Sequence, residues 1–355
     1  MADASVLQTQ ETPDLRSHWL ALKEAEPTAR AKDAARKLGV TEAELVACRC
    51  GDGVRRLQGP WGDLLQDLPS LGEVMTLTRN EHVVHEKHGT FGNVSVARSM
   101  GLVLNGEIDL RVMLSQWGSG FAVTEELSSG LRHSLQFFGP DGTAIHKIYV
   151  PKDDNATAYE DLVGKYIADD QGPDLSVVPR PAPRAEKPDS EIRVEEMRDA
   201  WRALDDVHDF MIMLRKYKVS RTQAMRLVGD DLAWRVEPES FVRALEEAAS
   251  SGLSIMIFVG SPGVIQIHTG RVEKLRRVSE WFNVLDPRFN LHLKDGDIAS
   301  AWIVRKPTRD GIVTSLEIFN RDNEQIALMF GERHEGDPEN TVWRDLAESL
   351  EKLTP

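Results

Sequence analysis

The stretch IMIFVGSPGVIQIHTG, residues 255–270, contains two short apolar runs separated by the turn sequence Gly-Ser-Pro-Gly. Short alternating runs broken by Gly and Pro are typical of antiparallel β-strands. The earlier stretch VMTLTRNEHVVHEKHG, residues 74–89, matches it at a constant offset of 181 residues, as Gly89 and Gly270 show. The match predicts that the chain contains the same β-structure twice.

The match extends without a gap from about residue 74 to residue 149. The matched positions are mainly turn glycines and apolar residues, which determine where strands end and which face they bury. The pairs include Val103 and Leu104 with Val284 and Leu285, Leu110 with Leu291, Gly130 with Gly311, Ser134 and Leu135 with Ser315 and Leu316, Phe138 with Phe319, Asp141 with Asp322, and Ile145 with Ile326. So many coincidences at one offset predict that the two halves are duplicated copies of one domain.

The composition changes in the middle of the chain, where residues 169–196 read DDQGPDLSVVPRPAPRAEKPDSEIRVEE. This segment holds five of the 17 prolines and has no apolar periodicity, as is typical of a semi-extended linker. We therefore expect an N-terminal copy over residues 1–168, a proline-rich linker over 169–196 and a C-terminal copy over 197–355.

Each copy is predicted to begin with helices and to continue in strands. Residues 28–47 and 208–229 carry apolar side chains at three- and four-residue spacing, and Thr41 and Ser220 are suited to cap a second helix in each stretch. Alternating runs such as FNLHL, SAWIVRK and TSLEIFN then predict strands, and YEDLVGKYIA and TVWRDLAESLEKL predict a closing helix in each copy. The predicted class is α+β, with two similar halves that each have a large antiparallel sheet and flanking helices.

The charge balance argues against broad binding to polyanions. The 355 residues include 57 Asp and Glu against 43 Lys and Arg, so the formal net charge is −14. A surface of this sign repels nucleic acid and anionic membranes, and an anionic ligand would need a local basic pocket.

Cysteine usage and the chain's N-terminal stretch predict a cytoplasmic setting. Cys48 and Cys50 are too close together for an easy disulfide framework, and no second pair is present to complete a zinc site. The start MADASVLQTQETPD lacks the apolar segment of a signal peptide, and the apolar stretch SIMIFVG is too short to span a bilayer. We expect a reduced, cytoplasmic protein that is not inserted in a membrane.

Two motifs suggest other functions. KLGVTEAELVA and KYKVSRTQAMRLVG resemble helix-turn-helix pieces, which keeps a nucleic-acid-binding or regulatory protein open as the alternative, although Glu42 and Glu44 would face phosphate.

HVVHEKH places His82, His85 and His88 at three-residue steps, which on a helix would form a zinc site. On a strand, which the repeat favours, His85 points away from the other two. The common catalytic and nucleotide-binding motifs are absent.

His208, in the stretch WRALDDVHDF at residues 201–210, lies where the two copies differ. Trp201 and Leu204 match Trp19 and Leu22, but the first copy has no histidine at the position of His208. A residue confined to one copy is not required by the shared fold. Taken alone, a single histidine at a helix end is more often structural than a metal ligand.

Several long motifs resemble one family. WRALDDVHDF, SRTQAMRLVGDDLAWRV, IMIFVGSPGVIQIHTG and AWIVRKPTRDGIVTSLEIF are similar to the cytoplasmic hemin-handling proteins of bacterial haem-uptake systems, the HemS-type or hemin-degrading factor family. In the first half, TRNEHVVHE, NGEIDLRVMLSQW and RHSLQFF resemble the same family at matching places. The resemblance covers nearly the whole chain. It implies a duplicated domain of stacked antiparallel sheets with flanking helices.

The resemblance also assigns roles to individual residues. It makes His208, in the DVH motif, the axial ligand of the haem iron, and Arg111, in the DLR motif, the residue of the first half that reaches the distal face. It makes Arg221, Lys306 and Arg333 the contacts of the haem propionates. From their apolar rings alone, Phe210 and Phe258 are suited to be walls of the haem slot, although core packing is the commoner role of such residues. Phe330 stands where relatives have a tyrosine, so we expect one hydrogen bond to a propionate or to the ring edge to be absent, with a change in haem affinity or orientation and not in iron ligation.

Two activities follow from the resemblance: trafficking and storage of imported haem, or its oxidative degradation with release of iron. The ligand is haem b in both cases, and degradation would use His208 and Arg111 as catalytic residues with an external electron donor. The implied partners are an inner-membrane haem ABC transporter and a downstream haem oxygenase. The sequence does not decide between a haem chaperone and a haem oxygenase-like enzyme.

Overall fold

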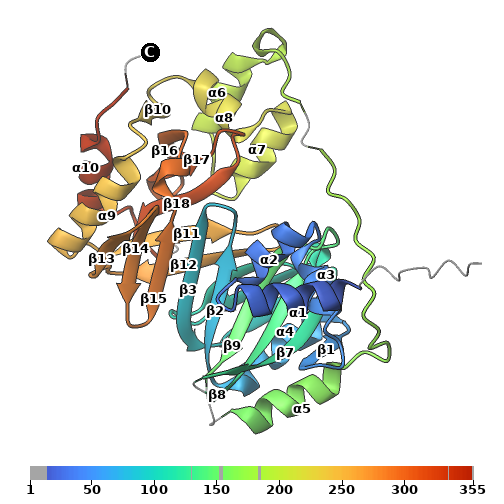
Figure 1. Cartoon of the computed structure of the whole chain (residues 1–355). Coiled ribbons are helices and arrows are strands. Elements are labelled where there is room, and N and C mark those ends of the chain that lie inside the picture. Colours follow the sequence, from blue (N-terminus) through green and yellow to red (C-terminus); the bar gives the residue numbers. More distant parts are fainter. Residues whose placement is uncertain (1–13, 129, 152–154, 183–184, 335, 354–355) are drawn as a thin grey trace, which may run out of the picture.

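The computed structural model describes residues 14–128, 130–151, 155–182, 185–334 and 336–353. Within these ranges the helices are α1 (Leu15–Ala25), α2 (Ala31–Leu38), α3 (Glu42–Ala47), α4 (Trp61–Asp67), α5 (Ala156–Tyr166), α6 (Val194–Arg202), α7 (Asp209–Tyr217), α8 (Arg221–Val228), α9 (Ser240–Ser251) and α10 (Thr341–Ser349). Residues 1–13, on which the expectation about a signal peptide rests, lie outside the described residues. Figure 1 shows the order of these elements along the chain.

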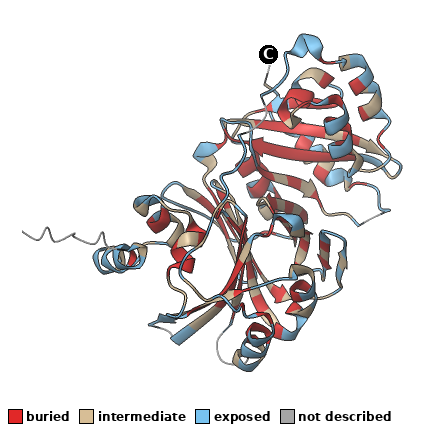
Figure 2. Cartoon of the chain, turned by 90° about the vertical axis from the view of Figure 1, so that its right-hand side faces the viewer, coloured by how far each residue is buried: buried red, intermediate tan, exposed pale blue. Residues whose placement is uncertain are grey.

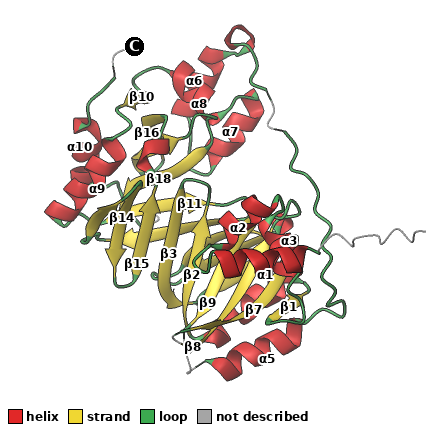
Figure 3. Ribbon diagram, viewed as in Figure 1, coloured by secondary structure: helices red, strands yellow, loops and turns green. Residues whose placement is uncertain are grey.

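The strands form two antiparallel sheets of nine strands each (Figures 1 and 3). The strands of the first half are β1 (Val54–Leu57), β2 (Glu73–Arg79), β3 (Val83–Thr90), β4 (Val94–Ala97), β5 (Met100–Leu104), β6 (Asp109–Met113), β7 (Ser119–Leu127), β8 (Gly130–Phe138) and β9 (Ala144–Val150). Those of the second half are β10 (Ala233–Val236), β11 (Ile255–Gly260), β12 (Val264–Gly270), β13 (Leu275–Val278), β14 (Trp281–Asp286), β15 (Phe289–Leu293), β16 (Ser300–Thr308), β17 (Gly311–Phe319) and β18 (Gln325–Gly331).

The two halves exchange strands. The first sheet has the order β1-β7-β8-β9-β2-β3-β15-β14-β13, and the second has the order β10-β16-β17-β18-β11-β12-β6-β5-β4. Each half therefore contributes six strands to one sheet and three to the other. The junctions are β3 with β15, where His85 lies opposite Leu291, and β12 with β6, where Ile265 lies opposite Arg111.

The structure confirms the α+β class, the duplication and the large antiparallel sheets. The exchange of strands was not predicted. The division of the chain into two domains at residues 169–196 stays a prediction. Both sheets take strands from both sides of that segment, so the sheets do not mark a domain boundary there.

Helices cover the second sheet from different sides (Figures 1 and 2). The helices α6 to α8 share a core with Trp302, Val304 and Phe319. By contrast, α9 and α10 share a core with the alternate residues of β16 and β17, such as Ile303 and Leu316. Successive residues of a strand point to opposite faces, so the two helix groups lie on opposite faces of the sheet.

The helix pairs α2–α3 and α7–α8 form with the predicted caps. Thr41 and Ser220 each accept a hydrogen bond from a backbone N–H in the first turn of the second helix. However, five of the six residues of α3 and five of the eight residues of α8 are buried. A recognition helix must expose one face to a DNA groove, so the structure gives the nucleic-acid alternative no support.

The motif HVVHEKH forms a strand and not a metal site. His85 is buried within β3, whereas His82 precedes the strand and bonds through its ring to Asp297 and Asn320. Among the described residues, no three His, Cys, Asp or Glu side chains are placed to hold a metal ion. Cys48 and Cys50 are free thiols.

A strip of polar side chains lies between the two sheets. Thr78 of the first sheet bonds to Gln266 of the second at 2.8 Å, and Lys87 Nζ lies 2.7 Å from Nδ1 of His268. Burial lowers the pKa of His85 and of His146 to about 3 and lowers the pKa of His268. These histidines are therefore neutral in the folded chain.

Acidification is expected to destabilise the fold through these histidines. The unfolded chain, with ordinary histidine pKa values near 6.5, binds more protons in acid than the folded chain does. The stability that the neutral histidines contribute is fully present above about pH 6.5 and is lost as the pH falls toward 3. At pH 5, His85 and His146 should each lower the free energy of unfolding by roughly 2 kcal/mol relative to its value at neutral pH. Urea unfolding at pH 7 and pH 5 measures this loss. His146→Gln should reduce the pH dependence and the exposed control His18→Gln should not; equal dependence in both variants would contradict this account.

Candidate functional site

One face of the second sheet carries a row of half-buried apolar side chains, which we call the apolar shelf: Met256, Phe258, Ile265, Leu328 and Phe330. The register places them on one face, because Phe258 lies opposite Leu328, and Met256 lies opposite Phe330. The rings of Phe258 and Phe330 lie 4.9 Å apart between centroids. The alternate residues of β11 are buried against the other face. Apolar side chains gathered on an accessible surface are typical of a ligand-binding site.

Arg111 reaches this sheet because β6 of the first half pairs with β12 of the second. Its register partner is Ile265 of the shelf, so Arg111 lies on the same face. Its guanidinium pairs with the carboxylate of Asp109, and 31% of its side chain is exposed. The strand exchange therefore supplies a cation from the first half beside an apolar face of the second.

A buried ion cluster adjoins the shelf, formed by Arg221 of α8, Lys306 of β16 and Glu317 of β17. Glu317 accepts hydrogen bonds from Nε of Arg221 at 2.5 Å, from Nη2 of Arg221 at 2.7 Å and from Nζ of Lys306 at 2.8 Å. Glu317 is fully buried, and 4% of the Lys306 side chain is exposed. Two cations face one anion, so the cluster carries one net positive charge.

The surroundings of the cluster determine its protonation. Burial lowers the pKa of Lys306 to about 8, although Glu317 acts in the opposite direction. Burial alone would raise the pKa of Glu317, but Arg221 and Lys306 hold it well below its usual range. Both cations also lie 5.0 Å from the centroid of the Phe210 ring.

Lys306 also connects the ion cluster to the shelf, since its Nζ lies 5.8 Å from the centroid of the Phe330 ring.

His208 is the N-cap residue of α7, and 83% of its side chain is exposed. Its ring Nδ1 lies 2.5 Å from Oδ1 of Asp206, and its backbone N–H donates to the same oxygen at 2.8 Å. The preceding loop is tied to the turn between β16 and β17, where the Arg309 N–H donates to the Asp205 carbonyl at 3.1 Å. The helix start is thus attached to the strand that carries Lys306.

Arg333 follows β18 and lies near the same turn, with Nη2 3.9 Å from Oδ2 of Asp310. The structure therefore brings the His208 loop, Lys306 and Arg333 to the end of the sheet at the β16–β17 turn. The register puts Arg111 toward the other end, in the row that contains Gly260.

Two site residues were missed by the sequence analysis, Glu317 and Asp206. The sequence around Glu317 could have indicated its role. A carboxylate inside the apolar run SLEIF must find cationic partners when the strand is buried. The indication for Asp206 was weaker, because the stretch DDVHD has three aspartates and only a structure shows which one contacts the histidine.

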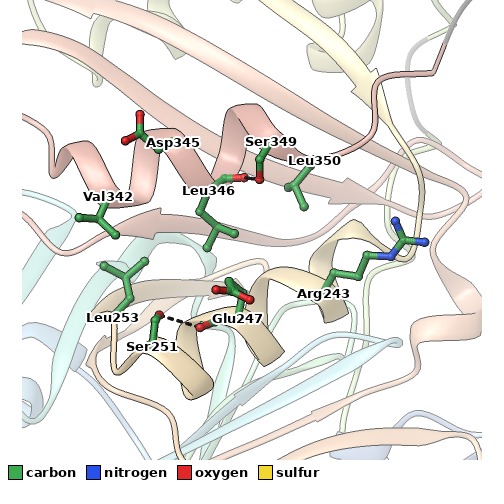
Figure 4. A pocket seen from close by; sticks show the side chains of 9 residues that line it. All are labelled: Arg243, Glu247, Ser251, Leu253, Val342, Asp345, Leu346, Ser349 and Leu350. Carbon is green, nitrogen blue, oxygen red and sulfur yellow. Dashed lines mark hydrogen bonds between the residues drawn. The ribbon is translucent and has the colours of Figure 1, made fainter.

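Two cavities lie away from the apolar shelf, and neither is lined by a predicted site residue. One of about 380 Å³ lies between α9 and α10, where Leu253 and Leu346 face each other in Figure 4. Another of about 230 Å³ lies between α8 and the edge of the second sheet and is lined by Gln223 and Trp302. In the part of the chain that the structure describes, no helix is long and apolar enough to cross a membrane.

The fold and this face define a class: internally duplicated two-sheet proteins with an apolar shelf bordered by buried cations. The model of the haemin-degrading HemS.ChuX domain matches residues 39–166 and, a second time, residues 218–350. The chain belongs to this family and contains its domain twice.

Curated relatives and solved structures agree with this assignment. The chain is 43% identical over 329 residues to the hemin transport protein HemS of Yersinia enterocolitica, which covers 92% of this chain and 94% of that protein. It superposes on the haem-bound form of PhuS, a haem-binding protein from Pseudomonas aeruginosa, with a TM-score of 0.93 and 45% identity, over 96% of this chain and 99% of that one. The similarity to ChuS, described as an Escherichia coli haem oxygenase, has a TM-score of 0.86 and 39% identity, over 95% and 99% of the two chains.

Proposed function

We propose that this protein binds one haem b on the apolar shelf, with His208 as the axial ligand of the iron. Haem is a flat apolar disc that carries two carboxylates at one edge and an iron that accepts an imidazole nitrogen. The observation that carries the proposal is the shelf of Phe258 and Phe330 next to a buried, net positive ion cluster. An exposed histidine follows the loop that is bonded to the β16–β17 turn.

The residues around the shelf fit the parts of this ligand. Lys306, Arg221 and Arg333 would hold the propionates, since the ion cluster has one positive charge that Glu317 does not neutralise. Arg111 is permanently charged and has five N–H donors, so it would bind a small polar ligand on the distal side. It cannot accept a proton itself.

The first copy does not repeat this arrangement, which supports a single haem. At the offset of 181 residues, Gln136 takes the place of Glu317 and Glu125 takes the place of Lys306. Glu125 pairs with Arg132 at 2.7 Å. A cluster at these positions is therefore specific to the second copy; the first copy has a buried cluster at other positions, where Glu42 pairs with Arg79 and Lys147.

We further propose that the protein receives imported haem in the cytoplasm and passes it on. The names of the relatives support haem carriage, since HemS is a hemin transport protein and PhuS is a haem-binding protein. A haem ABC transporter would be the donor and a haem oxygenase the acceptor. The second candidate is oxidative degradation, which the likeness to ChuS and the presence of Arg111 favour. Bound haem would supply the redox chemistry, and an external donor would supply electrons.

The two candidates predict different products. Visible titration of the purified protein should first give a one-to-one complex with a histidine-ligated spectrum. The complex is then supplied with NADPH and a reductase in the presence of catalase. If the protein only carries haem, the ring stays intact with catalase present. Ring-opened tetrapyrrole and free iron despite catalase, with loss of the product in Arg111→Ala, would instead establish an enzyme.

A further inference from the structure

We propose that Asp206 is a positioning residue for the iron ligand, which fixes the orientation of the His208 ring and strengthens it as a donor. This inference rests on the proposed role of His208. It concerns a carboxylate that would not itself touch the haem.

The contact with Asp206 uses one of the two ring nitrogens of His208 and leaves the other without this partner. Oδ1 of Asp206 lies 2.5 Å from ring Nδ1 and accepts the backbone N–H of His208 at 2.8 Å. An ionised carboxylate only accepts, so Nδ1 carries the proton in this contact. The nitrogen that remains for iron is Nε2, the other nitrogen of the ring.

The ring has little else to hold it. With 83% of the His208 side chain exposed, packing does not restrict its rotation. Asp206, in contrast, is held through its backbone, because its carbonyl accepts the N–H of Asp209 at 3.1 Å in the turn that starts α7. Arg309 Nη2 also lies 3.9 Å from the second carboxylate oxygen of Asp206. The carboxylate therefore links the exposed ring to an anchored loop.

The same hydrogen bond changes the ligand chemically. A carboxylate that accepts the Nδ1 proton increases electron density on the imidazole, which makes Nε2 a more basic ligand. A more basic ligand stabilises the ferric state and lowers the midpoint potential of the iron. Loss of such an outer partner typically weakens metal binding about 10- to 100-fold.

The test compares Asp206→Asn with the matched control Asp205→Asn in the full-length haem complex. Both variants remove one negative charge from the same loop. Asp205 pairs with Arg309 at 3.8 Å, whereas the bond to the His208 ring comes from Asp206. We expect the midpoint potential to rise clearly more in Asp206→Asn, and the iron–histidine stretching band of the ferrous complex to move to lower frequency in that variant alone. Haem transfer to apomyoglobin should be about tenfold faster from Asp206→Ala.

The outcomes separate this inference from the proposed function. Equal shifts of potential in both Asn variants, with an unmoved stretching band, would mean that Asp206 acts only as a distant charge and would overturn the inference. An unchanged haem spectrum in His208→Ala would instead overturn the ligand assignment itself. Thermal unfolding of the apo forms checks that both variants fold like the parent.

Discussion

Replacing His208 by alanine should abolish the histidine-ligated haem spectrum and leave the apo protein as stable as the parent. The ring is largely exposed and bonds to the carboxylate of Asp206, so its removal creates no cavity. Exposed substitutions of this kind change the free energy of unfolding by about 0.5 kcal/mol or less. Loss of outer partners already weakens metal binding about 10- to 100-fold, so loss of the ligand should lower haem affinity by on the order of 100-fold or more.

The measurement is a visible haem titration together with thermal unfolding of the apo protein. The control is His18→Ala, which removes an exposed histidine of α1 in the first half. Added imidazole should restore a nitrogen-ligated spectrum to the His208 variant, because it can occupy the vacated position. A variant that keeps both the spectrum and the affinity of the parent would show that another residue binds the iron.

The fold was largely predictable because the duplication is recorded in the spacing of glycines and apolar residues. The strands β7 and β16, and the strands β8 and β17, begin and end at positions that differ by the same offset as their sequences. Strand exchange was not predictable, for a physical reason. Two similar copies offer similar strand edges, so alternation alone cannot show that β12 pairs with β6 of the other copy and not with β15 of its own.

The site was predictable only in part, and for a related reason. Arg111 belongs to the first half by sequence, and only the exchange puts it on the second sheet. Arg221 and Lys306 were recognised as cations, but the sequence did not show that both bond to Glu317. Arg221 and Glu317 are 96 positions apart, so their contact depends on how α8 packs on the assembled sheet, which local sequence does not encode. Lys306 and Glu317 are 11 positions apart, and their contact depends on the register of β16 and β17.

Replacing Glu317 by alanine should cause the largest loss of stability among the changes considered for this site. The carboxylate is fully buried between Arg221 and Lys306, and 4% of the Lys306 side chain is exposed. Removal of one partner from a buried ion pair leaves a charge without compensation, which typically costs about 3–5 kcal/mol. Urea unfolding of the apo protein at pH 7 measures this cost. A loss below about 1 kcal/mol would show that water reaches the cluster and compensates Lys306.

A double variant separates the stabilising role of the cluster from its proposed role in holding haem. Lys306→Met with Glu317→Leu replaces the buried pair by apolar groups of similar size, which is often neutral or stabilising. Arg221 keeps access to solvent with 18% of its side chain exposed, so it can do without Glu317. We therefore expect the double variant to unfold at nearly the same urea concentration as the parent.

The haem complex of the double variant should nevertheless be weaker. Without Lys306, one propionate loses a charge-assisted hydrogen bond worth about 1.5–3 kcal/mol, and haem transfer to apomyoglobin should accelerate by at least about tenfold. The expected pattern is thus a single variant that loses stability and a double variant that loses haem. If the double variant releases haem as slowly as the parent, the ion cluster serves only to join α8 to the sheet, and the propionates must be held by Arg333 and other groups at the edge of the shelf.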